Sequence, residues 1–250
     1  MSYKSQILQI SEIQISINDL FYKELLSYAL ESGKQLSQLK VLDWGCGRGR
    51  YVGFLLSQGI DSFGVDIDNT VISQAKPLFN KNNWEFERRL NLIGRNNKTN
   101  FPNEYFDFVF SDQVIEHVQD IRGLGDELNR ITKKDGRQIH RWPSKFKIIE
   151  PHLYMPLIHW LPKGFLRYFG ILVYTACGIE PHWSELDGQS IWSKARTYSK
   201  YSHQKTYYRP LYVITRLFKT SWKLEYFPQY KKIRKLFHLQ FKTVILKLYK

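Results

Sequence analysis

Three glycines at alternate positions, Gly45, Gly47 and Gly49, follow a short apolar segment and precede a segment with a helical apolar pattern. The apolar segment, residues 40–43, is typical of a buried strand, and residues 51–57 place apolar side chains on one face of a helix. Glycine lets the backbone turn tightly and approach a ligand closely, because it has no Cβ. We therefore expect a ligand at the point where this helix begins.

Acidic residues near this loop indicate which ligand it holds. Asp66 ends a second apolar run and lies 21 positions after Gly45, where a doubly wound sheet places a carboxylate against ribose hydroxyls. A dinucleotide fingerprint would place its third glycine at position 50, where this chain has Arg50. It also does not require an acid two residues before the first glycine, where this chain has Asp43. The pattern favours a nucleoside cofactor other than NAD or FAD.

Together these residues resemble motif I and the acidic loop of the class I S-adenosylmethionine-dependent methyltransferases, in the branch that includes the ubiquinone and menaquinone methyltransferases. Residues 106–118 resemble that family's fourth strand and the loop after it, and residues 135–143 resemble its fifth strand. The resemblance covers residues 38–145. It implies an α/β fold with a Rossmann-like, doubly wound, mostly parallel seven-stranded sheet and an antiparallel carboxyl-terminal edge. It also implies S-adenosyl-L-methionine as the cofactor.

The resemblance assigns individual residues to this cofactor. The three glycines would pass under its methionine end, where Asp43 would orient the ammonium group, while Asp66 would bind the ribose and Ile67 would face the adenine. Three further residues would lie near the sulfonium, at the carboxyl end of the fourth strand: Ser111, Asp112 and Gln113. Asp112 has an alternative interpretation as a helix cap. The acid that the family carries after its third strand is missing here, and the nearest candidate is Asn91.

We expect one methyltransferase domain in four parts. They are a helical cap over the cofactor cleft, a cofactor-binding core, a substrate-recognition insertion, and a last helix with two strands, at residues 1–37, 38–145, 146–209 and 210–250. Residues 210–219 have the apolar spacing of a helix, and residues 222–227 and 241–249 are typical of strands. The chain of 250 residues is 43% hydrophobic, which is enough for a buried core.

The cysteine content and the start of the chain bear on its location. Cys46 and Cys177 have no metal-binding spacing, and Cys46 lies in the glycine loop. We therefore expect no disulfide framework, no metal site and a reducing compartment. Residues 1–12 contain no apolar stretch long enough for a signal peptide. These features favour a cytoplasmic protein, with peripheral contact at the inner face of the membrane as a further option.

Positive charge is concentrated towards the carboxyl end. Residues 1–150 hold 20 Lys and Arg against 19 Asp and Glu, whereas residues 151–250 hold 17 against 4, together with 21 of the 39 aromatic residues. A basic and aromatic surface attracts anions such as phosphate, nucleic acid or a lipid surface. The alternative is a solvated face that keeps the protein soluble. The basic run at residues 231–235 allows the same two interpretations.

The insertion begins with a distinctive segment, residues 149–162, with the sequence IEPHLYMPLIHWLP. Class I methyltransferases commonly insert substrate-recognition elements here, and the Glu-Pro-His and His-Trp-Leu-Pro runs resemble a segment of bacterial methyltransferases of glycan pathways. Residues 151–162 and 168–179 are uncharged runs of 12 residues each, shorter than the roughly 20 residues that span a bilayer. They suit an interfacial membrane segment or a lid helix packed over the active site.

Methyl transfer from a sulfonium requires the protein to align the acceptor, to exclude water and, for a hydroxyl acceptor, to remove a proton. Histidine is suited to take up a proton near neutral pH. The first candidate base is His152, with Glu150 beside it in the insertion, and the second is His117 after the fourth strand. His117 has the alternative role of shaping the cofactor loop. His140 on the fifth strand is a third candidate, and a structural role is the alternative for each histidine.

The favoured hypothesis is methyl transfer to an oxygen of a glycan, a lipid-linked molecule or another small anionic acceptor. The basic part of the chain would position the substrate or the membrane that carries it. The second hypothesis is an RNA methyltransferase, which the charge favours, although the sequence has no recognisable RNA-binding motif and no Asn-Pro-Pro-Tyr loop after the fourth strand. The third is a non-catalytic protein that binds S-adenosylmethionine. The sequence does not indicate an oligomeric state.

Overall fold

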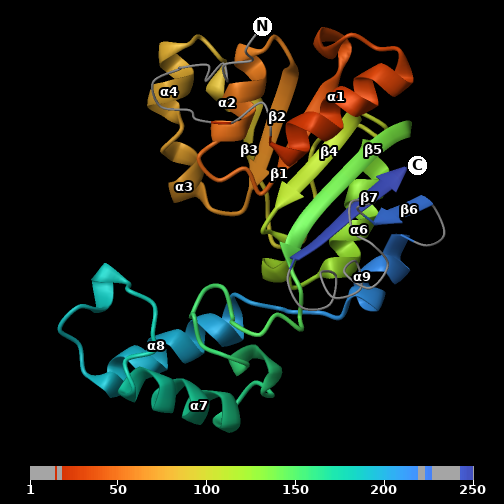
Figure 1. Ribbon diagram of the computed structural model, residues 1–250. Helices are drawn as coiled ribbons and strands as arrows, with labels where there is room; N and C mark the ends of the chain where they lie inside the picture. The colour runs from red at the N-terminus through yellow and green to blue at the C-terminus, as the bar shows by residue number, and fades with distance from the viewer. Residues whose placement is uncertain (1–14, 16–18, 219–222, 227–242, 250) are drawn as a thin grey trace, which may run out of the picture.

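Seven strands form one sheet in the computed structural model, which describes residue 15 and residues 19–218, 223–226 and 243–249 (Figure 1). In chain order the strands are β1 (Lys40–Trp44), β2 (Asp61–Asp66), β3 (Leu90–Leu92), β4 (Phe106–Asp112), β5 (Thr132–Pro143), β6 (Lys223–Tyr226) and β7 (Thr243–Tyr249). Their order across the sheet is β3-β2-β1-β4-β5-β7-β6. The order reverses between β1 and β4, which creates the crevice where open α/β sheets bind ligands.

The first five strands pair in parallel, and β7 runs antiparallel to both β5 and β6. Asp43 of β1 lies beside Gly64 of β2 and Phe110 of β4, which fixes the register next to the glycine loop. This arrangement confirms the predicted α/β class, the mostly parallel seven-stranded sheet and its antiparallel carboxyl-terminal edge. The strands predicted at residues 222–227 and 241–249 are β6 and β7.

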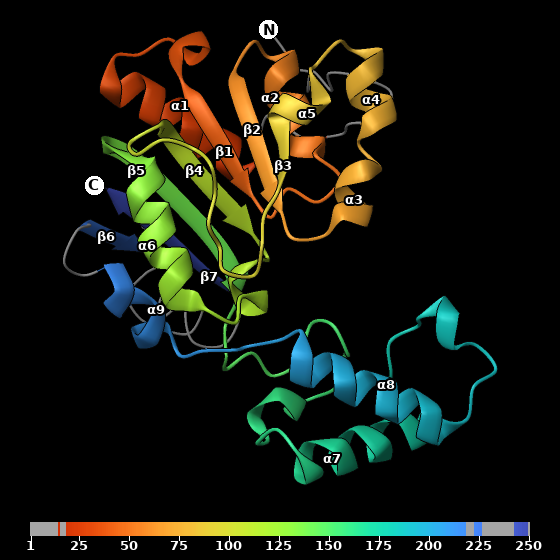
Figure 2. The same ribbon diagram turned by 180° about the vertical axis from the view of Figure 1, so that it is seen from behind.

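Helices cover both faces of the sheet (Figures 1 and 2). They are α1 (Leu20–Ser32), α2 (Arg50–Ser57), α3 (Asn69–Ser73), α4 (Lys76–Lys81), α5 (Phe86–Arg89), α6 (Ile121–Ile131), α7 (Phe165–Ala176), α8 (Ile191–Gln204) and α9 (Leu211–Phe218). Short 3₁₀ turns lie at Leu36–Gln38, Ile115–His117, Ile158–Trp160 and Ser184–Leu186.

Successive strand residues point to opposite layers, as the pleat of a strand requires. On one face Val41 of β1 and Phe110 of β4 pack with apolar residues of α1 and α2. On the other face Leu42 and Val109 pack with apolar residues of α6 and α9. Strands that are buried on both faces have continuous apolar runs, which explains why β1 and β4 are apolar throughout their centres.

The helix expected near the amino terminus is α1, and it is capped at both ends. Asp19 caps its first turn by accepting a hydrogen bond from the backbone of Phe21 at 2.8 Å. Gly33 ends the helix in a left-handed conformation, with φ of 66°. Lys34 then forms an ion pair of 3.0 Å with the buried Asp107 of β4.

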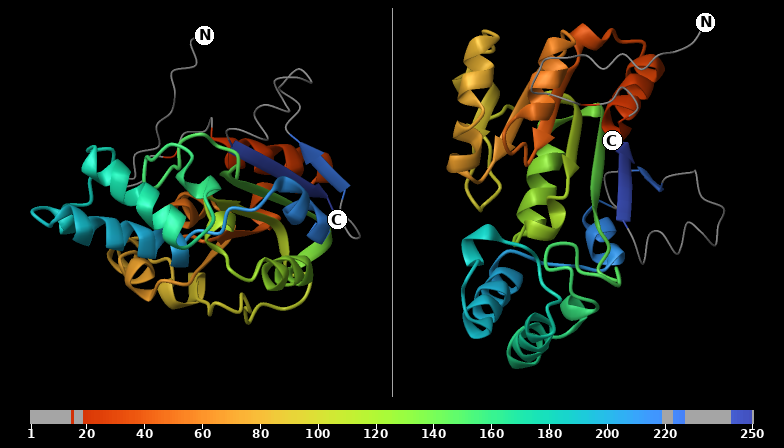
Figure 3. Two further views of the ribbon diagram at one scale, coloured as in Figure 1. Left: turned by 90° about the horizontal axis from the view of Figure 1, so that it is seen from below. Right: turned by 60° about the vertical axis from the view of Figure 1, so that its left-hand side comes forward.

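Residues 146–209, predicted as an insertion, form a separate layer beyond the carboxyl ends of the parallel strands (Figure 3). Helices α7 and α8 pack together there around an apolar core of their own, which contains Leu153, Met155, Ile158, Ile171, Leu186, Ala195 and Tyr198. Within the described ranges, no helix has the length and apolar character needed to cross a membrane. The basic run at residues 231–235 lies outside the described residues.

Candidate active site

The glycine loop joins β1 to α2 and lies against the end of β2. The backbone N–H groups of Gly45 and Cys46 donate hydrogen bonds to the carbonyl of Val65, at 2.8 and 3.0 Å. Gly45 has φ of +82°, and a Cβ at this position would lie 2.3 Å from Cγ2 of Val114. Any larger residue at position 45 would therefore displace the loop after β4.

Gly49 has a packing role. It is the N-cap of α2 with φ of +63°, and a Cβ there would lie 2.7 Å from Cδ1 of Leu90 in β3. Two cavities lie next to the glycine loop, and neither is lined by Gly47 or Gly49. Their predicted place under the methionine end of the cofactor stays a prediction.

Asp66 holds this loop with both carboxylate oxygens. Oδ2 accepts a hydrogen bond from the backbone of Gly47 at 2.8 Å, and Oδ1 accepts one from the backbone of Asp68 at 3.0 Å. Each oxygen keeps a lone pair that a ribose hydroxyl can use. Ile67 exposes 51% of its surface and lines the same cavity as Asp66. The positions of Asp66 and Ile67 suit the roles predicted for them.

A first cavity of about 400 Å³ lies over the carboxyl ends of the strands. Asp66, Ile67 and Ile93 line one side of it, and residues of the insertion, among them Tyr201 and Tyr207, line the other. Open α/β sheets bind their ligands at this edge.

A second cavity, of about 500 Å³, lies on the other side of the glycine loop. It is lined by Asp43 and Cys46 from the loop region and by Asp19 at the start of α1. Gly45 and Asp112 line both cavities. An elongated ligand that occupies both cavities would therefore pass between Gly45 and Asp112.

Three carboxylates lie around the point where the two cavities meet: Asp43, Asp66 and Asp112. Burial, followed by the charges of Asp112 and Asp66, raises the pKa of Asp43 well above its ordinary value. Asp112 ends β4 and pairs with Arg141 of β5, through Nε at 2.7 Å and also through Nη2, so it is not a helix cap. A positively charged ligand offsets such a concentration of negative charge, and S-adenosylmethionine carries an ammonium and a sulfonium group. The residues present therefore fit this cofactor.

Two predicted residues lie elsewhere. Ser111 lines neither of the two cavities, because its hydroxyl points into the core and lies 2.8 Å from Nδ1 of His140. His140 is fully buried, its Nε2 lies 3.0 Å from Oε1 of Gln138, and burial lowers its pKa to about 3. We therefore place Ser111 and His140 in a buried polar network. Gln113, in contrast, has φ of 56° and lines the first cavity.

Histidines from two distant segments meet at the side of the first cavity that faces the insertion. His117 lies in the 3₁₀ turn after β4 and lines the cavity, and His152 lies in the insertion, with 4.9 Å between the ring centroids. Nδ1 of His117 lies 2.6 Å from the carbonyl oxygen of Lys205. Because a carbonyl only accepts, Nδ1 carries the proton and donates it. Burial lowers the pKa of His117, which keeps the ring neutral.

The predicted pair of His152 and Glu150 is present. Nδ1 of His152 lies 2.8 Å from Oε1 of Glu150, and the hydroxyl of Tyr208 donates to the same oxygen at 2.5 Å. Burial by itself raises the pKa of Glu150, but the hydrogen bonds from His152 and Tyr208 outweigh it, so the pKa is lowered. Glu150 is thus an ionised, buried acceptor that orients His152, and it does not line either cavity. This geometry favours a positioning role for Glu150, and its catalytic role stays a prediction.

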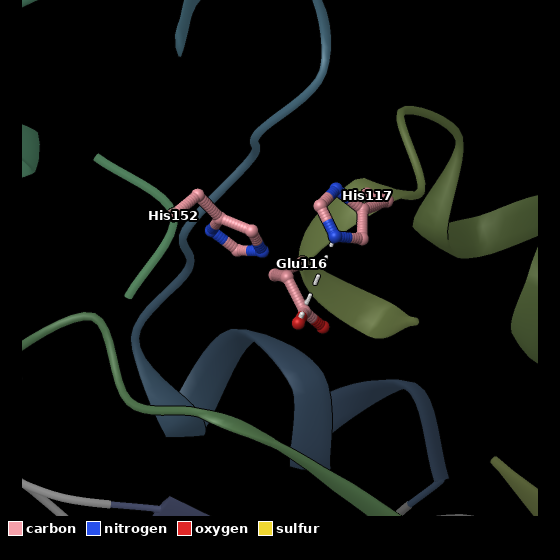
Figure 4. A group of neighbouring side chains, drawn as sticks. All are labelled: Glu116, His117 and His152. Atoms are coloured by element: carbon pink, nitrogen blue, oxygen red, sulfur yellow. Dashed lines mark ion pairs between the residues drawn. The ribbon is translucent and has the colours of Figure 1, made fainter. Parts of the chain in front are cut away.

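Sequence reasoning misses Glu116, which precedes His117. Glu116 is only 1% exposed, and neither carboxylate oxygen has a hydrogen-bond partner among the described residues. Its Oε1 lies 3.9 Å from Nε2 of His117, the pair that the dashed line marks in Figure 4. Burial raises the pKa of Glu116 to about 8. The sequence does place the acid Glu116 next to the candidate base His117. The burial of Glu116, however, depends on the fold and cannot be seen in the sequence.

Other residues of the first cavity are also absent from the prediction. Arg95 and Asn97, in the loop after β3, line it near Ile93. Asn91, the candidate offered by the sequence, instead donates to the carbonyl of Arg88 at 3.4 Å. Lys205 lines the cavity from the end of the insertion. The aromatic and basic composition of that segment was its sequence signal, and composition does not point to particular residues.

Sequence comparison places the core of this chain among methyltransferases. Residues 42–139 match the family described as a methyltransferase domain. The ubiquinone biosynthesis O-methyltransferase of Rhodopseudomonas palustris (strain BisB18) is 31% identical over 134 residues, which are 52% of this chain and 50% of that protein. The protein of the same name from Bradyrhizobium sp. (strain ORS 278) is 29% identical over 134 residues, 52% of this chain and 51% of that protein. The chain thus spans about half the length of the curated relatives it matches.

Solved structures share the fold over most of this chain. The S-adenosylmethionine-dependent methyltransferase from Mesorhizobium loti has a TM-score of 0.55 at 12% identity and covers 93% of this chain and 99% of its own. The geranyl diphosphate C-methyltransferase from Streptomyces coelicolor A3(2), crystallised with S-adenosyl-L-homocysteine, has a TM-score of 0.53 at 9% identity and covers 91% and 78%. The family match and the shared fold confirm the predicted cofactor, S-adenosylmethionine. Residues 42–139 therefore match a methyltransferase domain, and the chain has the fold of S-adenosylmethionine-dependent methyltransferases.

Proposed function

We propose that this protein transfers a methyl group from S-adenosylmethionine to a hydroxyl oxygen of a lipid-linked acceptor. The observation that carries this proposal is the first cavity, which has Asp66 and Ile67 on one side and His117, Tyr201 and Tyr207 on the other. One cavity can therefore bring the cofactor next to an acceptor held by the insertion. When bound, S-adenosylmethionine supplies a methyl group on a positively charged sulfur, which an electron-rich oxygen can attack.

The groups around His117 support an oxygen acceptor. A hydroxyl loses its proton when its oxygen bonds to the methyl group, and the cluster of Glu116, His117 and His152 places polar groups where that loss can be promoted. The relatives named above are O-methyltransferases of ubiquinone biosynthesis, which agrees with transfer to oxygen. Their name does not match the glycan that the insertion sequence suggested, nor does it name a lipid-linked acceptor, which we propose from the surface of the insertion.

The surface of the insertion supports a lipid-linked acceptor. Phe165, Leu166, Phe169 and Val173 share one face of α7 at helical spacing and expose 45–76% of their surfaces. Trp160, just before α7, exposes 43%. A helix with an exposed apolar face is typical of segments that lie in a membrane interface. We infer that α7 contacts the membrane surface and that the acceptor passes from the lipid into the first cavity.

The test uses purified protein and methyl-labelled S-adenosylmethionine, with a lipid extract, a polysaccharide fraction and total RNA in separate reactions. Label in the lipid fraction, assigned to an oxygen by mass spectrometry, supports the proposal. The same reaction with the Asp66→Ala variant, at a cofactor concentration below the Kd of the parent, must take up much less label, which excludes a contaminating enzyme. Label in RNA or polysaccharide, or a methyl group on nitrogen or carbon, overturns the assigned acceptor. Cofactor binding without label in any fraction favours the non-catalytic hypothesis.

A further inference from the structure

Glu116, His117 and His152 lie close together beside the first cavity (Figure 4). Each offers one ligand atom, and these atoms all lie within 4.8 Å of one another. Glu116 and His117 come from the turn after β4, whereas His152 comes from the insertion. The fold thus joins two imidazoles and a carboxylate that are separate in the sequence.

In both histidines Nδ1 makes a hydrogen bond to another residue, which leaves Nε2 of each ring available as a ligand atom. His117 donates Nδ1–H to the carbonyl of Lys205, so its Nε2 carries a lone pair. Oε1 of Glu150 lies 2.8 Å from Nδ1 of His152 and also accepts from Tyr208, so Nδ1–H of His152 donates to Glu150 and the neutral form of this ring has its lone pair on Nε2. Histidines that bind metal ions usually donate the other ring N–H to a carboxylate or a backbone carbonyl. Here His117 donates to the backbone carbonyl of Lys205, and His152 donates to the carboxylate of Glu150.

The carboxylate of Glu116 supplies an independent observation. It is buried, it lies 3.9 Å from Nε2 of His117, and neither oxygen accepts a hydrogen bond from the described residues. A buried carboxylate without a partner is costly, and native proteins usually satisfy such a group. A cation held by Glu116 and the two Nε2 atoms would provide that partner.

We propose that Glu116, His117 and His152 bind one divalent transition-metal ion of the Zn²⁺ type. Two neutral imidazoles and one carboxylate suit Zn²⁺ and related ions, whereas Mg²⁺ and Ca²⁺ prefer a shell of oxygen ligands. Bonds of about 2.0–2.2 Å bring the ligand atoms of a tetrahedral ion roughly 3.3–3.6 Å apart. The ligand atoms would therefore have to move closer by up to about 1.5 Å to hold the ion. Three protein ligands leave the fourth position open, as in catalytic zinc sites.

The role of the ion rests on the proposed function. Because His117 also lines the first cavity, an ion held on its Nε2 would lie beside the acceptor site. A hydroxyl bound to the ion has a lowered pKa and releases its proton to water. Its oxygen then forms the bond to the methyl carbon, and the carbon–sulfur bond breaks with its electron pair remaining on sulfur. His152 acts here as a metal ligand, in place of the general-base role that the sequence predicts.

Metal binding is tested on the full chain without any acceptor. The protein is stripped with a chelator and dialysed against Zn²⁺, and bound zinc is measured by inductively coupled plasma mass spectrometry and titration calorimetry. We expect one equivalent in the parent. Glu116→Gln, His117→Ala and His152→Ala should each weaken binding by roughly 100-fold or more, since even loss of an outer partner costs about 10–100-fold. His203→Ala, which removes an exposed histidine of α8, should keep one equivalent.

Absence of bound zinc in the parent, or an equal affinity in all four variants, overturns the site. Circular dichroism shows whether each variant is folded. Co²⁺ provides a second measurement, because its visible absorption reports imidazole ligands directly. We expect the Co²⁺ bands of the parent to disappear in His152→Ala.

The role of the ion is tested separately, with the lipid acceptor identified by the labelling experiment. Loss of methyl transfer on stripping and its return with Zn²⁺ support the role. Full activity of the stripped protein overturns the role and leaves the proposed function intact. Zinc bound at the three residues with no methyl transfer to any fraction overturns the proposed function and leaves the site intact.

Discussion

The carboxylate of Asp66 has two tasks at the residue scale. It fixes the glycine loop by accepting from Gly47, and it presents its remaining lone pairs to the first cavity. Hydrogen bonds to a charged group contribute about 1.5–3 kcal/mol each. The free energy of cofactor binding therefore depends on this one side chain in two ways, through loop shape and through direct contact.

Asp66→Ala should weaken S-adenosylmethionine binding by about 10–100-fold, the equivalent of about 1.4–2.8 kcal/mol. Isothermal titration calorimetry measures this change. Asp126→Ala is the matched control, because Asp126 is exposed on α6 and lines neither cavity. Equal affinity in Asp66→Ala and the parent would remove the ribose assignment.

The end of β4 shows which single residues the sequence could predict. Asp66 and the three glycines follow from local spacing, because a loop and its neighbouring strand end lie close together in any such sheet. Ser111 and Asp112 are adjacent in a strand, so their side chains point to opposite faces. Only Asp112 reaches the cavities, and Ser111 is buried against His140. The resemblance predicted that the end of β4 lies near the cofactor, but the pleat of the strand decides which of its side chains faces the ligand.

At the scale of elements, Asp107 joins three of them. Its buried carboxylate accepts from Lys34 after α1 at 3.0 Å, from the backbone of Lys40 at the start of β1 at 3.0 Å, and from Lys133 of β5 at 2.8 Å. Removing one partner of a buried ion pair is destabilising. The two lysines are each about one-third exposed, so water can solvate them when the carboxylate is lost.

Asp107→Asn should lower the free energy of unfolding at pH 7 by about 1–3 kcal/mol, measured by urea denaturation. Asp135→Asn is the matched control. Asp135 pairs with the same Lys34 at 3.0 Å but has a side chain that is 67% exposed. Exposed ion pairs contribute little, so this control should change stability by less than about 1 kcal/mol. A similar loss in both variants would contradict the role of burial.

The contribution of Asp107 should depend on pH. Burial raises its pKa, but the hydrogen bonds from Lys133, Lys40 and Lys34 outweigh burial, so the pKa in the folded state is lowered. A lowered pKa gives stability that is complete above the ordinary value of about 3.9 and is lost as the pH falls through the folded-state value. The stability difference between parent and Asp107→Asn should thus be largest near neutral pH and shrink in acid. A difference that stays constant with pH would contradict this linkage.

Helix α7 tests the membrane proposal. Phe165 and Phe169 expose 76% and 55% of their surfaces on one helix face. Burying such side chains is worth about 1.5–3 kcal/mol each, and partial insertion gains part of this. The double variant Phe165→Gln/Phe169→Gln should bind anionic lipid vesicles about 10–100-fold more weakly in a sedimentation assay. Leu30→Gln on α1, at a residue that is 84% exposed, should bind as the parent does.

The insertion also shows which property of a helix the sequence did not predict, namely which of its faces packs inward. The uncharged run at residues 168–179 indicated an apolar segment, but it did not distinguish a helix that packs inward from one that exposes a face. In α7, Ile171 and Thr175 face the insertion core while Phe165 and Phe169 face outward. This division depends on α8, which covers one side of α7. The sequence therefore predicted the composition of the layer and not its orientation.

At the scale of the whole molecule, the insertion is fastened to the turn after β4. The backbone of Tyr207 donates to the carbonyl of Glu116 at 2.6 Å, and the Arg209 guanidinium donates to the carbonyl of Gln119 at 2.7 Å. The carbonyl of Lys205 accepts from His117. An ion on Glu116, His117 and His152 would add a connection between the same two layers.

Zinc should therefore stabilise the molecule and slow the opening of this joint. A ligand at about 100 times its Kd adds about 2.7 kcal/mol to stability, which corresponds to a rise in Tm of about 5–10 °C for a chain of this size. In the same samples, hydrogen exchange at the amide of Tyr207 should slow, because that amide donates across the joint, while exchange in α4 should not change. Glu116→Gln should show neither effect, and neither should Mg²⁺ with the parent. A rise in Tm without slower exchange at Tyr207 would mean that zinc binds elsewhere on the chain.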